Sequence, residues 1–493
     1  MIEEKDGALY AAFKSKDPRF DGRFFVGVSS TGIYCRPICR ARLPRAENCT
    51  YYATAAEAEQ AGFRPCLQCR PELAPGLAPV DAMASLAHKA ARLIEENCGN
   101  DESLTELAGK LGCTDRHLRR TFTAEYHVTP VQYLQTCRLL FAKSVLTDTG
   151  LSVLEVALAS GFGSLRRFND LFKKRYRLTP TALRKEASVA KKRDEGSITL
   201  ALGYRPPYRW EQILAFLGLR SIPGVETVKE NAYFRTVHLV TGERKHLYGW
   251  IRVSDQPQKS ALSVTVSATL LPVLPQVLSR VRRLFDLYCE PDAVQEALLC
   301  MNDIKPGLFL PGIRVPGCFD AFEMSVRAVL GQQITVKAAT TLAGRFAEKF
   351  GAAIDTGIEG LAHAFPSPEV ILTLEAPVEN HLGPLGIIAA RAKTILALAE
   401  RFSKEAIGCG FCIQPEDEIT KLMELPGIGP WTAQYIAMRA FEWTDAFPDT
   451  DLGVKKALAP LGRKGILALA EHWRPWRAYA TLCLWNSRES QGG

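Results

Sequence analysis

The spacing of apolar and polar residues divides most of the chain into segments with different periods. Residues 83–185 and 285–490 repeat apolar positions with a helical period, the latter in Leu- and Ala-rich stretches broken by Pro and Gly. Residues 197–284 contain alternating runs such as Leu262–Val266, which are typical of half-buried strands. The pattern therefore predicts a multidomain, mainly α protein with an α+β segment between two helical ones.

Two loop signals mark the ends of segments. The stretch Pro71–Gly76 is rich in Pro and Gly, and the stretch Glu186–Gly196 (EASVAKKRDEG) is polar and has the composition of a linker. Together with the periodicity, these signals predict four domains, which span residues 1–78, 83–185, 197–284 and 285–490.

Composition and charge narrow the setting in which the chain works. Its fourteen cysteines are scattered, and the start MIEEKDG lacks a charged-then-apolar signal segment. No apolar run in the sequence approaches the roughly 18 residues that span a bilayer. The net charge is +8, with most of the excess in residues 80–195. We expect a cytoplasmic protein with reduced thiols and no membrane partner, whose basic segment either attracts phosphates or is a solvated surface.

Four cysteines form two closely spaced pairs: Cys35 and Cys39, and Cys66 and Cys69. Two such pairs supply the four tetrahedral thiolate ligands that zinc takes, although unrelated buried cysteines are the alternative. A segment of under about 80 residues struggles to build a sufficient core, so one bound Zn²⁺ would stabilise it. A further pair, Cys409 and Cys412, has no partner pair and is expected to pack in a core.

Arginines crowd around the proposed ligands in the sequence: Arg36, Arg40, Arg42, Arg45, Arg64 and Arg70. A four-thiolate zinc site carries a net charge of about −2, so nearby cations stabilise it and can also hold a DNA phosphate. We take Arg36 and Arg40 as candidate DNA contacts. A zinc-bound thiolate remains a nucleophile at neutral pH, so the site is either reactive or only structural.

Longer stretches around the quartet resemble the N-terminal domain of the Ada-type methylphosphotriester-sensing regulators. They are DGRFF at 21–25, TGIYCRPICRAR at 31–42, Ala53–Glu59 and AGFRPCLQC at 61–69. The resemblance implies a small α/β zinc domain in which the first cysteine, Cys35, accepts a methyl group from a DNA phosphotriester. Methylation would move the site from about −2 to about −1 and weaken its repulsion of DNA phosphates.

A helix, a short Gly turn and a second helix occur twice in the middle segment. Ser103–Ala108, with a Ser cap and Glu106, precedes one turn, and Ser152–Ala157 precedes the other. Two copies joined by a long helix at about 131–147 favour paired helix-turn-helix units that read the major groove. The candidate phosphate or base contacts, each with a plain surface charge as the alternative, are Arg116, Arg119, Arg120, Arg166, Arg167 and Lys173.

This segment, including its closing YRLTP at 176–180, resembles the AraC-type DNA-binding domain. The resemblance implies an all-α domain with two helix-turn-helix units that binds promoter DNA. It also implies a transcription activator, with RNA polymerase as an expected partner.

A hairpin motif and an aspartate lie near the end of the chain. In Leu425–Ala433 (LPGIGPWTA), Gly427 and Gly429 allow backbone N–H groups to approach a phosphate, although a plain helix–helix turn is the alternative. Asp451 follows about twenty residues later, in FPDTDLGVK. This arrangement is typical of the helix-hairpin-helix glycosylase superfamily. An anionic Asp451 would stabilise the oxocarbenium ion that forms as an N-glycosidic bond breaks.

Residues 198–490 resemble the AlkA-type 3-methyladenine DNA glycosylases II. The matching stretches include GYRPPYRW at 203–210, FDAFE at 319–323, RAVLGQQ at 327–333 and WRPWR at 473–477. The resemblance implies an α+β (TBP-like) subdomain followed by an all-α helix-hairpin-helix domain. It also implies a double-stranded alkylated DNA substrate, release of 3-methyladenine and 7-methylguanine, and a monovalent cation as a candidate ligand of the hairpin.

The same resemblance assigns roles to single residues. Asp451 falls on the catalytic carboxylate, and Trp431, Tyr435 and Trp485 fall on the base pocket, with core packing as the alternative for each aromatic. A cationic alkylated base stacks well on aromatic faces once it is flipped out of the duplex. Gln333 falls on the position that fills the gap left by the flipped base, where some relatives carry an apolar residue.

Three departures refine the expected activity. Trp431 stands where strand-cleaving members of the superfamily carry Lys, so a monofunctional enzyme is expected. Only Cys483 lies near the C-terminus, so no iron–sulfur cluster is expected. The Pro-Cys-His-Arg motif of O6-alkylguanine methyltransferases is missing. The favoured hypothesis is a fused alkylation sensor, regulator and glycosylase, and the alternative is a regulator whose catalytically weak C-terminal half serves DNA binding.

Overall fold

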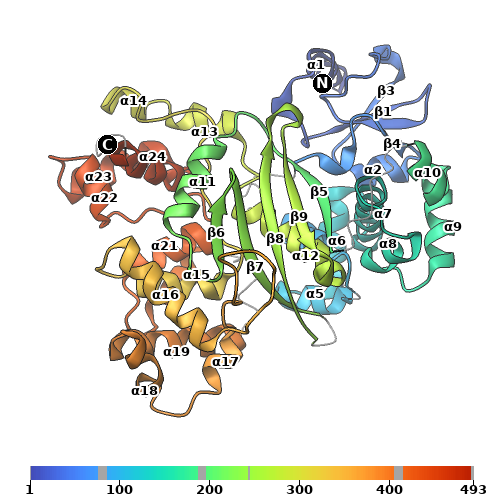
Figure 1. The fold of residues 1–493 in the computed structure, drawn as a ribbon. Helices are drawn as coiled ribbons and strands as arrows, with labels where there is room; N and C mark the ends of the chain where they lie inside the picture. Colours follow the sequence, from blue (N-terminus) through green and yellow to red (C-terminus); the bar gives the residue numbers. More distant parts are fainter. Residues whose placement is uncertain are drawn as a thin grey trace. The chain divides into compact units, whose positions relative to one another are not determined.

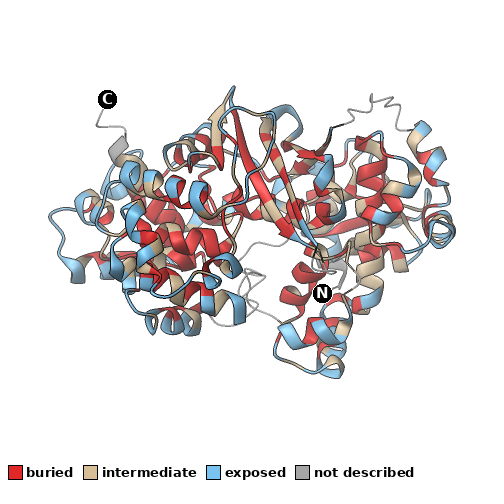
Figure 2. Cartoon of the chain, turned by 60° about the horizontal axis from the view of Figure 1, so that its bottom comes forward, coloured by how far each residue is buried: buried red, intermediate tan, exposed pale blue. Residues whose placement is uncertain are grey.

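The computed structural model describes residues 2–75, 86–100, 102–186, 196–241, 245–404 and 415–489. The chain divides into two compact units: unit 1 holds residues 1–206, 239–247 and 255–279, and unit 2 holds residues 207–238, 248–254 and 280–493. Helices of each unit carry buried residues on one side and exposed residues on the other (Figure 2). No helix among the described residues is both long and apolar enough to cross a membrane. Cys409 and Cys412, the expected core cysteines, lie outside the described residues.

A four-stranded sheet organises the first part of unit 1 (Figure 1). Its order is β3-β1-β2-β4, with β1 at Phe25–Val28, β2 at Ile33–Cys35, β3 at Cys49–Tyr52 and β4 at Arg64–Pro65. The helices here are α1 (Ile2–Ser15), α2 (Ala55–Gln60) and short 3-10 turns at Pro18–Phe20, Ala46–Asn48 and Pro71–Leu73. Since β2 ends at Cys35 and pairs with β4, which Cys66 follows, the sheet brings one cysteine of each pair onto neighbouring strands.

The middle segment forms the predicted helices of two helix-turn-helix units. They are α4 (Leu86–Glu96), α5 (Leu104–Lys110), α6 (Asp115–Tyr126), α7 (Pro130–Asp148), α8 (Val153–Ala159), α9 (Leu165–Tyr176) and α10 (Pro180–Glu186). Ser103 and Glu106 form the predicted capping box of α5, and Ser152 begins α8 in the same way. The turns use left-handed glycines, Gly112 at φ +66° and Gly161 at φ +74°. The predicted repeat is confirmed.

Buried ion pairs join α7 to the segment that follows Cys69. The ammonium of Lys143 lies 2.5 Å from a carboxylate oxygen of Glu72, and both side chains are at most 3% exposed. Arg70 lies 2.9 Å from Glu72 and 2.7 Å from Asp148. Two cations therefore balance two carboxylates where water is largely excluded. Removal of any one of these charges would leave a buried charge without full compensation.

We expect Lys143→Met to lower the free energy of unfolding by about 3 kcal/mol, because it leaves the buried Glu72 carboxylate short of one partner. Urea unfolding followed by circular dichroism measures the change. Lys110→Met is the control, since Lys110 forms a more exposed pair with Glu102 and should cost under about 1 kcal/mol. Equal losses in the two variants would contradict this assignment.

Glu59 at the end of α2 is a second buried carboxylate. It accepts hydrogen bonds from the hydroxyls of Tyr34 at 3.1 Å, Thr136 at 3.3 Å and Tyr176 at 3.4 Å. Burial raises the pKa of Glu59 to about 7, although these hydroxyls and the charge of Arg175 lower it in part. The folded chain therefore keeps a proton on Glu59 at pH values where the unfolded chain has lost it.

This proton makes stability depend on pH. Between the ordinary carboxyl pKa and about 7, the folded state binds more protons than the unfolded state, so the free energy of unfolding falls as pH rises. We expect a fall of about 3 kcal/mol across this window. Denaturant titrations of the wild type and of Glu59→Gln at several pH values measure it. The variant should lack this part of the slope, and an unchanged slope would refute the assignment.

The α+β segment forms the predicted strands: β5 (Ser197–Gly203), β6 (Glu226–Lys229), β7 (Ala232–Val240), β8 (His246–Gln256) and β9 (Ala261–Ser267), in the sheet order β5-β9-β8-β7-β6. In unit 1, β5 pairs antiparallel with β9, so that Ile198 lies opposite Val266. Leu262, Val264 and Val266 of the predicted alternating run are fully buried. In unit 2, β6 pairs antiparallel with β7. The sequence pattern thus identified the buried face of β9 correctly.

The remaining segment is helical, as predicted. Its helices are α13 (Pro291–Leu298), α14 (Met301–Ile304), α15 (Ala321–Leu330), α16 (Val336–Phe350), α17 (Pro368–Leu372), α18 (Glu379–Leu382), α19 (Ala389–Lys404), α20 (Pro415–Met423), α21 (Pro430–Ala440), α22 (Leu452–Ala457), α23 (Arg463–Ala470) and α24 (Arg477–Glu489). Two further helices, α11 (Trp210–Leu219) and α12 (Leu274–Leu284), belong to the α+β segment. Short 3-10 turns lie at Pro257–Lys259, Ala268–Val273, Gly383–Leu385 and Glu471–Trp473. The predicted hairpin joins α20 to α21, and Asp451 directly precedes α22, which packs on α24.

Candidate metal centre, DNA-binding surface and active site

The four predicted zinc ligands come together in unit 1. The sulfur atoms of Cys35, Cys39, Cys66 and Cys69 all lie within 4.8 Å of one another. Cys69 is half-buried, the other three are buried, and apolar side chains such as Phe24 and Val26 pack against the cluster. The backbone N–H of Arg36 donates a hydrogen bond to the sulfur of Cys69 at 3.3 Å. This donor set at this separation fits the four-thiolate coordination of Zn²⁺.

The structure corrects the expectation that Arg36 contacts DNA. Arg36 is only 8% exposed, and its Nε donates to the carboxylate of Asp21 at 2.8 Å. Its Nη1 donates to the backbone oxygen of Cys69 at 3.1 Å. A buried guanidinium needs such partners, so Arg36 holds the ligand loop from within. Arg40 is exposed and stays a predicted DNA contact.

The basic residues predicted on the helix-turn-helix units all lie at the surface. On α6, Leu118 and Phe122 face the core. The opposite, exposed side of the helix carries Arg116, Arg119 and Arg120. On α9, Phe168 and Phe172 face the core, and the exposed side is formed with Arg166, Arg167 and Lys173. A shallow groove follows each exposed side. Because each helix turns its basic side outward, either can approach the phosphates beside a major groove.

Gly427 is packed too closely for any other residue. It lies at φ +80°, and a Cβ atom there would come within 2.3 Å of the Thr394 hydroxyl, which itself donates to the backbone oxygen of Pro426 at 2.7 Å. Gly429 caps α21, whose first residue is Pro430. The hairpin therefore presents a fixed backbone at the start of a helix, where an anion is favoured.

Asp451 is held by donors on both carboxylate oxygens. Its Oδ2 accepts a hydrogen bond from the indole N–H of Trp431 at 2.9 Å. Its Oδ1 accepts from the indole of Trp485 at 2.9 Å and from the backbone N–H groups of Gly453 at 2.7 Å and Val454 at 3.1 Å. The same oxygen thereby caps α22. These bonds fix the position of a half-buried negative charge beside aromatic side chains.

The predicted pocket aromatics form one contiguous wall beside Asp451. The rings of Trp431 and Tyr435 stack with centroids 5.3 Å apart and planes inclined by 6°, and Trp485 lies 6.2 Å from Tyr435. Arg439 donates to the hydroxyl of Tyr435 at 2.9 Å. Burial raises the pKa of Tyr435, but the nearby guanidinium of Arg439, with other arginines, outweighs it and lowers the pKa below its ordinary value. The wall offers the faces of three aromatic side chains beside a carboxylate, a surface on which a cation can stack.

Gln333, the predicted gap-filling residue, lies in the loop between α15 and α16. It is exposed and adopts a left-handed backbone at φ +55°. Its neighbour Gln332 donates hydrogen bonds to the hairpin, to the oxygen of Gly427 at 2.9 Å and to the hydroxyl of Thr432 at 3.0 Å. The structure thus brings the loop that carries Gln333 against the hairpin.

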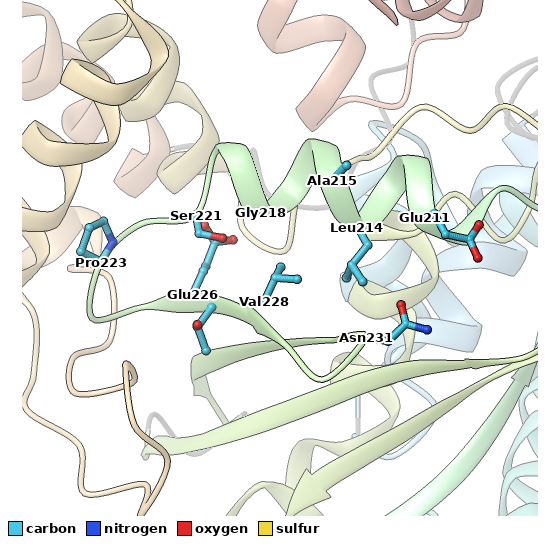
Figure 3. A pocket seen from close by; sticks show the side chains of 10 residues that line it. Glu211, Leu214, Ala215, Gly218, Ser221, Pro223, Glu226, Val228 and Asn231 are labelled. Carbon is cyan, nitrogen blue, oxygen red and sulfur yellow. The ribbon is translucent and has the colours of Figure 1, made fainter. Parts of the chain in front are cut away.

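A separate hollow lies between α11 and β6 (Figure 3). It is lined by Glu211, Leu214, Ala215, Gly218, Ser221, Pro223, Glu226, Thr227, Val228 and Asn231. Glu226 is buried and forms an ion pair with Arg327 at 2.9 Å. Its buried charge is therefore already paired, and none of its lining residues belongs to the predicted sites.

Four family models match consecutive parts of the chain. The metal binding domain of Ada matches residues 8–72, and a helix-turn-helix domain matches residues 107–186. The AlkA N-terminal domain matches residues 199–320. The HhH-GPD superfamily of base excision DNA repair proteins matches residues 326–465. Each match falls in the part of the chain that carries the corresponding motif, and the helix-turn-helix match begins within the first helix of the repeat.

A probable bifunctional transcriptional activator/DNA repair enzyme AlkA of Mycobacterium tuberculosis is 36% identical to this chain, over 97% of the chain and 96% of that protein. The chain belongs to this family. DNA-3-methyladenine glycosylase 2 of Escherichia coli is 35% identical over 58% of the chain and 95% of that protein. The bifunctional transcriptional activator/DNA repair enzyme Ada of Escherichia coli is 38% identical over 32% of the chain and 43% of that protein. This chain of the AlkA-type bifunctional family thus resembles Ada in its first part and a glycosylase in its last.

Two residues of this family member escaped the sequence reasoning. Arg439 lies four residues after Tyr435 on a predicted helix. This spacing places both side chains on one face of the helix and could have indicated their contact. Gln332 reaches acceptors that are 95 and 100 residues away in the chain, so no local pattern could have identified its role.

Proposed function

We propose that this chain senses DNA alkylation, regulates transcription and excises alkylated bases such as 3-methyladenine and 7-methylguanine. The observation that carries the enzymatic part is the Asp451 carboxylate, fixed by the indoles of Trp431 and Trp485 beside a stacked aromatic wall. The observation that carries the sensor part is the four-sulfur cluster. We further propose that four domains, at 1–78, 83–185, 197–284 and 285–490, divide these tasks.

Base release follows from the charge at Asp451. An extrahelical cationic base stacks on the wall formed with Trp431 and Tyr435. The positive charge of the alkylated base draws electron density out of the N-glycosidic bond. As the bond breaks, the electron pair leaves with the base, and the carboxylate stabilises the sugar cation. Water then adds to the sugar carbon and loses a proton to the surrounding solvent. No lysine stands at position 431, so the sugar forms no Schiff base and the strand stays uncut.

Methyl transfer is assigned to Cys35. Bound zinc would keep the cysteine sulfurs in their anionic, nucleophilic form. The sulfur of Cys35 forms a bond to the methyl carbon of a phosphotriester, and the bond from that carbon to oxygen breaks, which leaves an ordinary phosphodiester. The protein then carries a thioether and one negative charge less, so its affinity for promoter DNA rises.

The exposed basic sides of α6 and α9 are proposed to bind promoter DNA, and the activated complex to recruit RNA polymerase. The hairpin at Gly427 is proposed to hold a phosphate of double-stranded DNA together with a monovalent cation. We place this work in the bacterial cytoplasm, at the nucleoid.

The decisive test is incubation of the purified chain with alkylated duplex DNA. Chromatography should detect free 3-methyladenine and 7-methylguanine, and their absence would refute the glycosylase function. The same protein, digested and weighed after exposure to DNA with methylphosphotriesters, should carry roughly 14 extra mass units on the Cys35 peptide. An unmodified Cys35 peptide would refute the sensor function but not the glycosylase.

Phosphate contacts on α6 predict a defined salt dependence. Arg120→Ala should weaken promoter binding for every sequence tested and reduce the slope of log K against log salt concentration by about 0.9. Lys14→Ala, which removes an exposed charge from α1, is the matched control and should leave the slope unchanged. Fluorescence anisotropy at several salt concentrations measures both. Identical slopes for the wild type and Arg120→Ala would exclude Arg120 from the interface.

A further inference from the structure

The loop between α15 and α16 is anchored to two other parts of unit 2 through Gln332. The side-chain amide donates to the backbone oxygen of Gly427 at 2.9 Å and to the hydroxyl of Thr432 at 3.0 Å. The backbone oxygen of Gln332 accepts a hydrogen bond from Arg391 of α19. One residue therefore connects the gap-filling loop, the hairpin and α19.

The hairpin is held at the same junction from its other side. The hydroxyl of Thr394, also on α19, donates to the backbone oxygen of Pro426 at 2.7 Å, and the space beside Gly427 is filled by that same hydroxyl. The hairpin backbone therefore lies between α19 and Gln332. A displacement of the loop would break both amide hydrogen bonds of Gln332.

The residue after this anchor has an unusual backbone. Gln333 is a non-glycine residue at φ +55°, a conformation that persists only where the surrounding structure fixes it. It is exposed, and the following apolar side chains Ile334 and Val336 are 37% and 38% exposed. An exposed polar tip with apolar neighbours suits insertion between base pairs, where a wedge contacts both base edges and base faces.

We propose that Gln332 is a positioning residue that couples the hold of the hairpin on the DNA backbone to the insertion of Gln333 into the gap left by a flipped base. This inference rests on the proposed glycosylase function. The gap-filling residue has to stay in the stack for as long as the base is out of it. A loop that moves independently would let the flipped base return to the duplex. A loop that is hydrogen-bonded to the hairpin stays in place for as long as the hairpin holds the DNA phosphate.

Gln332→Met tests the coupling, because it keeps the length of the side chain and removes both donors. Two duplexes carry 7-methylguanine, one opposite cytosine and one opposite an abasic-site analogue, where no pairing opposes flipping. We expect the single-turnover rate to fall at least about tenfold on the paired duplex and under about threefold on the unpaired one. Gln333→Ala should show the same difference between the two duplexes. Thr432→Val removes one of the two acceptors of Gln332 and should show a smaller difference.

Each other outcome decides against the coupling. If Gln332→Met lowers the rates on both duplexes equally, Gln332 only supports the fold. If it lowers neither rate, Gln332 has no role in the reaction. Thermal midpoints of the variants, expected within a few degrees of the wild type, accompany the rates.

The outcome remains interpretable if the wild type releases no base. In that case the proposed glycosylase function fails, and fluorescence of 2-aminopurine placed at the target position reports flipping alone. An increase in 2-aminopurine fluorescence that the wild type gives and Gln332→Met does not would support the coupling. Equal increases with both proteins would overturn it.

Discussion

Replacing Asp451 with asparagine should lower the rate of base release on the order of a thousandfold. Asparagine has the size of aspartate and can still cap α22, but it carries no charge to oppose the developing sugar cation. It also presents an amide N–H₂ toward the indole of Trp431 or Trp485, both of which donate to Asp451. Single-turnover release of 7-methylguanine from a defined duplex measures the effect.

Asp417→Asn is the matched control for this variant. Asp417 is exposed in the first turn of α20, the helix before the hairpin, and its neutralisation should leave the rate within about twofold of the wild type. Affinity of Asp451→Asn for a duplex with an abasic-site analogue should also stay within a fewfold. Full activity after neutralisation of Asp451 would overturn the proposed mechanism.

Removal of zinc should unfold the first 75 residues. A four-thiolate zinc site contributes about 10–16 kcal/mol of binding free energy, whereas whole domains are stable by about 5–15 kcal/mol. The cluster of Cys35, Cys39, Cys66 and Cys69 lies within the core that Phe24 and Val26 complete, so its loss removes both metal bonds and packing. A chromophoric chelator should remove one zinc ion per chain, and limited proteolysis should then cut within residues 6–75.

Cysteine variants separate the metal from general thiol chemistry. Cys66→Ser should lose zinc and become sensitive to protease in the same region. Cys49→Ser should keep the metal, because the thiol of Cys49 donates to the backbone oxygen of Arg45 and lies outside the four-sulfur cluster. A zinc-free chain that resists protease as the loaded chain does would show that the core alone stabilises this part.

Features coded by short spacings were predictable from the sequence. Three features use residues that lie within a few positions of one another: the cysteine pairs, the Ser–Glu capping boxes and the hairpin. A short stretch of sequence is therefore enough to identify each of them. The resemblances then assigned Asp451 and the aromatic wall, and the structure brings Trp431, Tyr435 and Trp485 together beside that carboxylate.

Features that depend on distant partners were not predictable. Arg36 was expected to face DNA because it stands among other arginines, but Asp21 and the backbone of Cys69 draw it inward. Gln332 and Glu59 give no local sign of their roles, since Gln332 bonds to Gly427 and Glu59 is buried against Tyr176. In each case a long-range contact decides what the side chain does, and the sequence pattern records only its neighbours.

The seating of Asp451 makes its two oxygens unequal. A carboxylate oxygen offers about two lone pairs, and Oδ1 already meets three N–H donors, whereas Oδ2 meets one. Only Oδ2 keeps acceptor capacity toward a ligand. In the proposed mechanism, a water that attacks the sugar cation would therefore be oriented by Oδ2, the oxygen that also accepts the indole N–H of Trp431.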